Sequence, residues 1–196
     1  MKSTIKLLLA IGAFIVLGGC AHTIRITPDA AKLPVSDGAK RVAKNVGYFI
    51  SEEERNRRVI TGGGGGDKVE YAPYKELEAG IFRVLNNVFE NVHQLKAMDD
   101  TAFLTDKGIS LVLRPTVATN SSSTSLLTWP PTDFEVIIEI KALDTAGKVL
   151  WADTVSGKGR AEFSEFKSDF ALAAKRASEA ALVALQGRLV ASPVVR

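Results

Sequence analysis

The sequence predicts an α+β fold, with a mixed or antiparallel sheet of about four strands and two helices packed on one face. Two patterns support this. Residues 134–143 alternate between inward apolar side chains and side chains of the opposite face, as in a half-buried strand. Residues 74–92 instead repeat apolar side chains at helical spacing, which predicts a long amphipathic helix. The expected order is strand, helix, strand, strand, strand, helix.

The first core strand is expected at 46–50, a short apolar run between polar segments. The charged residues 52–58 indicate a solvated excursion, with a charged partner contact as the alternative. Five glycines at 62–66 invite comparison with a phosphate-binding loop. Asp67 would repel phosphate and Val69 has no hydroxyl for magnesium, so we expect a mobile surface loop.

The other strands are expected in the second half of the chain. One strand starts at 109 and continues to 118 if Pro115 falls at an edge or a bulge. The alternating strand then turns at 144–147 and returns from 148 to about 155, which completes a hairpin.

The chain is expected to end in a helix over residues 170–189. Ser168 is its expected N-cap, because a serine side chain can accept from the free amides of the first turn. The helix is rich in alanine on one side, which predicts a close approach to the sheet. Gly157 and Gly159, which precede it, are expected to mark a bulge or the end of a strand.

The N-terminal segment has the pattern of a secretory signal. Lys2 and Lys6 precede the apolar run 7–17, which is too short to span a bilayer comfortably. Residues 17–20, Leu-Gly-Gly-Cys, resemble a bacterial lipobox. The resemblance implies cleavage before Cys20, a diacylglycerol on its sulfur and an acyl chain such as palmitate on its new amino group. An ordinary signal peptide or membrane anchor with an incidental cysteine is the alternative.

The lipobox divides the chain into three parts. They are a signal peptide at 1–19, a lipidated cysteine with a tether at 20–45, and a single periplasmic α+β domain at 46–192. A linker of this kind would keep the domain clear of the lipid head groups. Ala21, rather than aspartate, follows the cysteine. By resemblance to the enterobacterial sorting rule, this favours the outer membrane, with the domain facing the periplasm.

Composition argues against catalysis and nucleic-acid binding. The two histidines of the mature chain are His22 and His93, and no free cysteine remains once Cys20 is acylated, so a cysteine nucleophile or histidine-rich metal site is excluded. His93 is expected near the C-terminus of the first helix, where a positive charge is favourable. Without the two signal lysines, 23 basic and 22 acidic residues remain, and the net charge falls from +3 to +1. We expect no enzyme, cofactor, metal or nucleic acid.

One loop is unusual enough to be a candidate contact site. The polar stretch 119–125 is followed at 126–131 by Leu-Leu-Thr-Trp-Pro-Pro. Prolines stiffen such a segment, and Trp and Leu anchor interfaces well, so Leu126, Leu127 and Trp129 are candidate partner-binding residues. The alternative is that these side chains fold back over one end of the core.

The lipobox, the element order and the hairpin at 144–151, Asp-Thr-Ala-Gly-Lys-Val-Leu-Trp, together resemble small periplasmic lipoproteins of Gram-negative bacteria. These include the ABC-transport auxiliary lipoproteins and the lipopolysaccharide-assembly lipoprotein, and the TolB amino-terminal domain has a similar fold. The resemblance covers about residues 46–189. The glycine run and the Trp-Pro-Pro segment depart from it.

The motifs that carry this resemblance are structural, so they transfer no specific activity. What they imply is a lipid-anchored binding or assembly module that docks on a cell-envelope protein complex for transport, secretion or surface assembly. The alternative is a periplasmic carrier that holds a lipid or another apolar ligand between the sheet and the helices.

Overall fold

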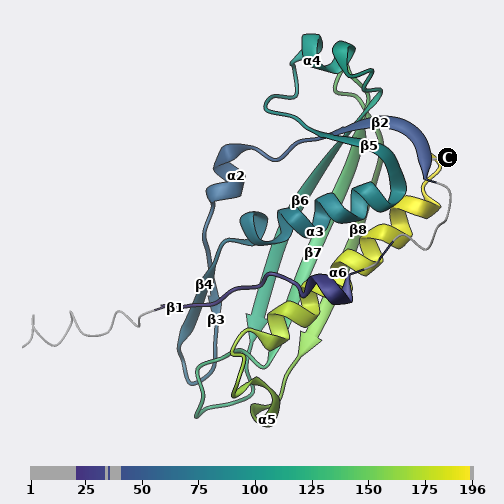
Figure 1. The fold of residues 1–196 in the computed structure, drawn as a ribbon. Helices are drawn as coiled ribbons and strands as arrows, with labels where there is room; N and C mark the ends of the chain where they lie inside the picture. Colours follow the sequence, from purple (N-terminus) through teal and green to yellow (C-terminus); the bar gives the residue numbers. More distant parts are fainter. Residues whose placement is uncertain (1–20, 34, 36–40, 195–196) are drawn as a thin grey trace, which may run out of the picture.

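The computed structural model describes residues 21–33, 35 and 41–194, which form two sheets and several helices (Figure 1). The predicted signal peptide at 1–19 and Cys20 lie outside the described residues. The strands are β1 (Ala21–Thr23), β2 (Val42–Tyr48), β3 (Val59–Gly62), β4 (Lys68–Tyr71), β5 (Phe89–Gln94), β6 (Leu111–Ser122), β7 (Asp133–Leu143) and β8 (Val149–Arg160). The helices are η2 (Ala30–Lys32), α2 (Glu52–Asn56), α3 (Pro73–Val88), α4 (Thr101–Asp106), α5 (Phe163–Phe166) and α6 (Leu172–Ala191).

The larger sheet has the strand order β5-β2-β6-β7-β8, and the smaller one has the order β1-β4-β3. Strand β2 runs parallel to β5 and β6, whereas β6, β7 and β8 form an antiparallel meander. The α+β class is confirmed. The expected single sheet of about four strands with two helices is too simple, because β5 extends the large sheet and the small sheet was not foreseen.

Pro115 lies inside β6, as the sequence allowed. Strand β2 pairs with β6 only over residues 46–48 and 111–113. The amide of Phe49 donates to the carbonyl of Leu113, so this side of β6 faces β2. Backbone groups alternate sides along a strand, so the nitrogen of Pro115 points to the same side, just beyond the end of β2. Its missing N–H therefore breaks no bond with β2.

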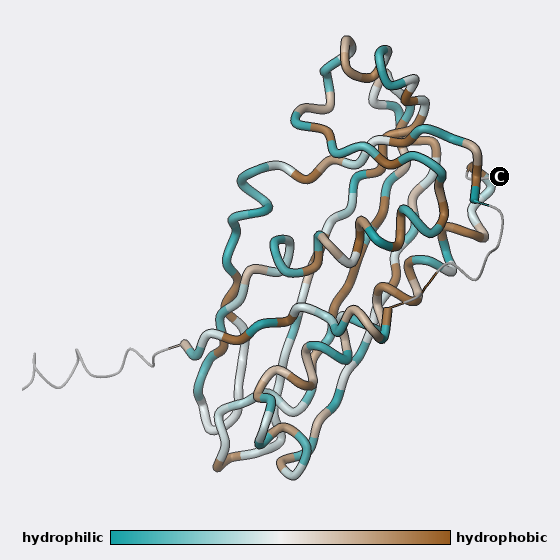
Figure 2. Tube along the Cα trace, in the orientation of Figure 1, coloured by the Kyte–Doolittle hydropathy of each residue, from teal (hydrophilic) through white to brown (hydrophobic). Residues whose placement is uncertain are grey.

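Helices α3 and α6 cover one face of the large sheet, and the main core lies between the two layers. Figure 2 shows hydrophobic residues recurring along the strands and both long helices. The other face is covered near α4, where Leu104 and Ile109 pack with Val112 of β6. Farther along, that face carries exposed side chains of β6 and β8, such as Thr116 and Ser156.

Helix α6 lies very close to β8 because the strand carries glycines where the helix crosses it. A Cβ at Gly157 would stand 2.2 Å from the nitrogen of Ala181, and one at Gly159 would stand 2.0 Å from the carbonyl oxygen of Ala173. The expected close approach of an alanine face is thus present. The glycines mark no bulge, because the register with β7 is regular at both of them, but β8 does end at Arg160, directly after Gly159.

The helix expected at 74–92 is shorter than its apolar pattern suggested. Helix α3 ends at Val88, and Phe89 adopts extended angles, φ −111° and ψ 151°, with its side chain fully buried. The residues that follow form β5 beside β2. His93 therefore lies in a strand, with its ring edge-on to Phe103 at 6.3 Å between centroids.

The final helix also begins later than expected. Its N-cap position is Ala171, whose side chain cannot accept a hydrogen bond. The carboxylate of Asp169 instead accepts from the Ala171 amide at 3.1 Å. Ser168 is therefore not the N-cap. The helix is held by its packing on the sheet more than by its first turn.

Residues 21–33 of the segment expected as a tether are part of the folded unit. Strand β1 pairs parallel with β4, and Ile24 and Ile26 are 4% and 0% exposed. The hydroxyl of Ser178 in α6 donates to the carbonyl of Ile26 at 2.8 Å. Local sequence allowed at most a short strand around Ile24 and Ile26, and it could not show their burial, because their partners lie far away in the sequence. The first described residue, Ala21, thus already belongs to the fold.

The contact between α6 and β8 predicts an unusual cost for a small substitution. In a strand, alanine normally replaces glycine at little cost, but Gly157→Ala should lower the free energy of unfolding by about 1–3 kcal/mol, because its methyl group overlaps the backbone of α6. Urea unfolding measures this. Ser156→Ala is the control, since its exposed side chain belongs to the opposite face. A wild-type midpoint for Gly157→Ala would contradict the close packing.

Candidate docking site

The loop that joins β6 to β7 presents its apolar residues in two ways. Leu126 and Leu127 are 86% and 96% exposed, so both side chains project from the surface. Trp129 is partly buried and packs against the main core. Of the two interpretations open from the sequence, the leucines therefore fit an outward contact, and the tryptophan fits a side chain that folds back.

The glycine run, expected to be a mobile loop, is the packing partner of this segment. Gly64 donates its amide to the carbonyl of Trp129 at 2.8 Å, and Gly65 donates to the carbonyl of Ser125 at 3.1 Å. A Cβ at Gly64 would stand 1.9 Å from the carbonyl oxygen of Thr128. Glycine is therefore required where the two backbones meet.

Ser125 orders the part of the loop that carries the leucines. Its hydroxyl oxygen accepts from the amides of Leu127 and Thr128 at 3.3 and 3.2 Å, and the Thr128 hydroxyl donates to it at 2.8 Å. A serine that bonds to the amides two and three residues ahead stabilises a turn. The two leucines are thus displayed on a hydrogen-bonded backbone, which lowers the entropy cost of any contact they make.

Trp129 connects the loop to the start of the described chain. Its ring stacks on His22 of β1, with centroids 4.2 Å apart and planes at 18°, and lies 5.0 Å from the ring of Phe170. The Nε2 atom of His22 is 3.6 Å from a carboxylate oxygen of Asp67 in the glycine turn. We call the region formed by β1, residues 63–67 and the loop 123–132 the anchor end.

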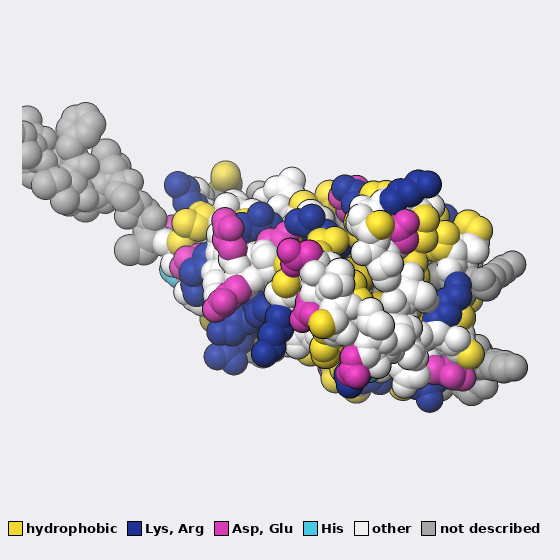
Figure 3. All heavy atoms as spheres, turned by 90° about the horizontal axis from the view of Figure 1, so that it is seen from above, with side chains coloured by type: hydrophobic (Ala, Val, Ile, Leu, Met, Phe, Trp, Pro, Cys, Tyr) yellow, Lys and Arg dark blue, Asp and Glu magenta, His cyan; other side chains and the backbone are white. Residues whose placement is uncertain are grey.

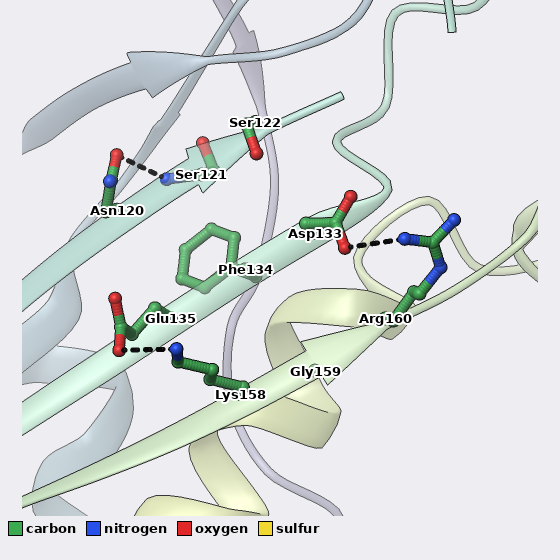
Figure 4. Close-up of a pocket in the computed structure, with 9 residues that line it drawn as sticks. All are labelled: Asn120, Ser121, Ser122, Asp133, Phe134, Glu135, Lys158, Gly159 and Arg160. Carbon is green, nitrogen blue, oxygen red and sulfur yellow. Dashed lines mark hydrogen bonds and ion pairs between the residues drawn. The ribbon is translucent and has the colours of Figure 1, made fainter. Parts of the chain in front are cut away.

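A polar depression of about 430 Å³ lies beside this loop, on the open face of the large sheet. Figure 4 shows Glu135 of β7 and Lys158 of β8 pointing toward each other, and Asp133 pointing toward Arg160. The ion-pair distances are 3.8 Å and 3.2 Å. The lining residues are Asn120, Ser121, Ser122, Asp133, Phe134, Glu135, Lys158, Gly159 and Arg160.

The charges of the depression are balanced. A hydrogen bond to Glu162 is the main reason that the pKa of Arg160 lies above its ordinary value, and the charge of Asp133 adds to it. Two carboxylates on β7 thus face two cations on β8. Figure 3 shows basic and acidic side chains interspersed on the face seen from above as well. Mixed charge of this kind suits a polar protein surface better than a single small ion.

A second open cavity, of about 580 Å³, lies between α3 and β5. Its polar centre is Glu78, which accepts from Tyr48 and Gln94 at 3.3 Å and pairs with Arg55 at 2.7 Å. Burial, followed by the charge of Glu78, raises the pKa of Tyr48 to about 12. These groups satisfy one another, so we assign no ligand to this cavity.

Among the residues that the structure describes, no group of three or more metal-ligating side chains comes together. No helix within this part of the chain is long and apolar enough to cross a membrane.

The contact between the glycine run and the loop can be tested at one position. Gly64→Ala forces the carbonyl of Thr128 away, so the amides of Gly65 and Thr128 should exchange hydrogen roughly tenfold faster than in the wild type. Hydrogen exchange read by NMR measures this. Gly62→Ala is the control, because its Cβ would meet the nearest atom, the carbonyl oxygen of Ser121, at an ordinary 3.4 Å. Unchanged exchange in Gly64→Ala would show that the loop is not held by the glycine run.

Comparisons with family models and with curated proteins find no match for this chain. Solved structures with a similar fold exist. One, from Helicobacter pylori, is described as a homologue of a neuraminyllactose-binding hemagglutinin; it is 12% identical, covers 83% of this chain and 90% of its own, and has a TM-score of 0.52. The match to a Xanthomonas campestris protein of the DUF330 family spans 88% of this chain and 95% of that protein, with 13% sequence identity and a TM-score of 0.49. The match to a Caulobacter crescentus structure described as a lipoprotein spans 74% of this chain and 88% of that one, with 11% sequence identity and a TM-score of 0.37. At such low identity, the Helicobacter structure shows a shared fold and nothing about ligands.

Proposed function

We propose that this protein is a lipid-anchored binding or assembly module of the bacterial cell envelope, and that it docks on an envelope protein complex. The observation that carries the proposal is the open face of the large sheet. Along β6 and β8, the side chains on that face are exposed, mostly small or polar, and covered by no described element. They are Thr116, Ala118, Asn120, Ser122, Ala152, Thr154, Ser156 and Lys158.

This face suits a flat protein contact. Its small side chains leave little steric obstruction, and the polar depression at one end offers paired charges in a defined order. Glu135 and Asp133 stand opposite Lys158 and Arg160. A partner with the complementary order of charges would be selected over others, because like charges brought together at an interface are unfavourable.

The envelope location rests on the lipobox. A thioether-linked diacylglycerol on Cys20 would hold the protein on a membrane, and Ala21 favours the outer membrane with the domain in the periplasm. The sequence placed the protein contact at Leu126, Leu127 and Trp129. We assign the contact to the sheet face instead, because the Trp129 ring stacks on His22 and the leucines belong to the anchor end.

The carrier alternative has less support. A carrier needs an enclosed apolar cavity between the sheet and the helices. In this fold the backbone of α6 touches β8 at Gly157 and Gly159. Both cavities described above open to the surface and are partly polar. We likewise propose binding rather than catalysis, since the carboxylates of the depression are each paired with a cation.

Site-specific crosslinking tests the docking face. The full-length lipoprotein carries a photoreactive benzoylphenylalanine in place of Ser156 and is irradiated in intact cells, and adducts are identified by mass spectrometry. We expect one defined envelope protein. The matched control is the same probe at Val183, which is exposed on α6, away from the sheet. Equal adducts from both positions, or none from position 156, would contradict docking on this face.

Charge reversal tests the depression itself. Lys158→Glu places like charges beside Glu135 and should lower the crosslink yield roughly tenfold, as expected for about 1.4 kcal/mol of lost affinity. Lys148→Glu, in the β7–β8 turn at the other end of the sheet, is the control. An unchanged yield in Lys158→Glu would remove the depression from the docking surface.

A further inference from the structure

We propose that the lipid bilayer covers the exposed leucine pair of the anchor end, and that Leu126 and Leu127 enter the boundary between head groups and acyl chains beside Cys20. The inference rests on the lipid anchor of the proposed function and names what that anchor brings into contact with the domain. The domain is then held in one orientation on the membrane.

Very little chain separates the proposed lipid attachment from the described fold. Ala21 is already in register with Lys68 across the β1–β4 pair. One peptide bond joins Cys20 to Ala21, and it separates their Cα atoms by about 3.8 Å. Ala21, which directly follows the proposed lipid attachment, is already paired in the small sheet, so one peptide bond is the whole spacer between them. The acyl chains can reach the hydrocarbon only if this end of the domain touches the membrane surface.

Leu126 and Leu127 lie close to the start of β1 and β4. Lys68 directly follows the turn at 63–67, and this turn is bonded to the β6–β7 loop through Gly64 and Gly65. A Cβ at Gly65 would stand 3.3 Å from the carbonyl oxygen of Leu126. The backbone at Leu126 thus packs on the turn at 63–67. Strand β4 begins directly after this turn, beside the start of β1.

The surface of the anchor end is apolar around Leu126 and Leu127. Leu127 and Leu126 are the most exposed large apolar residues of the described chain. Phe170, which contacts Trp129, is also exposed, at 47%. Apolar side chains at the level of the head groups gain by entering the acyl boundary. Lys68 is exposed beside Ala21, where it can meet anionic head groups.

A protein could cover the leucines only by entering the space between the domain and the bilayer. The bilayer is already there once Cys20 is acylated. A protein partner at the tip, which is what the sequence suggested, is therefore the outcome that contradicts this inference.

The test uses the full-length lipidated protein in vesicles of phosphatidylethanolamine and phosphatidylglycerol. Leu127→Cys carries an NBD fluorophore; Cys20 is the only native cysteine and is blocked by acylation. Vesicles with a nitroxide at the head group or at a shallow acyl position report contact with lipid. The matched probe is Ala146→Cys, in the turn at the opposite end of β7.

Nitroxide lipids should quench the probe at position 127 at least about twofold more than the probe at 146, with a blue-shifted emission. Leu126→Ser should reduce this quenching, whereas Leu150→Ser, at the other end of the sheet, should not. Equal access of aqueous iodide to both probes overturns the inference. So does shielding of position 127 that appears only after an envelope protein extract is added.

Mass spectrometry of Cys20 separates the two proposals. An acylated Cys20 with a water-exposed probe at 127 overturns only the leucine–bilayer contact. A chain that carries no acyl group overturns the anchor, and with it both proposals.

Discussion

The parallel pairing of β1 with β4 is the constraint on which the rest of this structure depends. It fixes the first described residues on the domain, with Ala21 opposite Lys68. It also places His22 where it stacks on Trp129 and lies close to Asp67. Strand β1, the turn at 63–67 and the β6–β7 loop are therefore one packed unit. A lipid on the preceding residue would act on that unit directly.

Close contact between backbones recurs in this fold, and glycine makes it possible. At Gly64 the glycine run meets the loop that carries the leucines, and at Gly157 and Gly159 strand β8 meets α6. The second contact fills the space that a carrier would need for its ligand. The interior is therefore closely packed, and the open sheet face and the anchor end are the surfaces on which the proposed envelope contacts would form.

The sequence predicted what local patterns determine. The alternation at 134–143 correctly gave β7, and the alanine face correctly gave the close approach of α6. Local patterns allowed a short strand near Ile24 but could not show that it joins the fold, because its partners lie far along the chain. They also merged β5 into the preceding helix, since Phe89 and Val92 fit helical spacing as well as a strand. The loop that carries Leu126 and Leu127 was found from composition. Its position beside β1 depends on contacts between residues far apart in the sequence, which composition does not show.

The pairing of β1 can be measured directly by hydrogen exchange of the lipidated protein. The amide of Ile24 donates to the carbonyl of Glu70 at 3.0 Å, and its side chain is buried. If β1 is part of the fold, this amide is protected to a level near that of the core strands, because it opens only with the small sheet. Exchange at the rate of an unstructured peptide would contradict the account, and would restore a free tether between Cys20 and the domain.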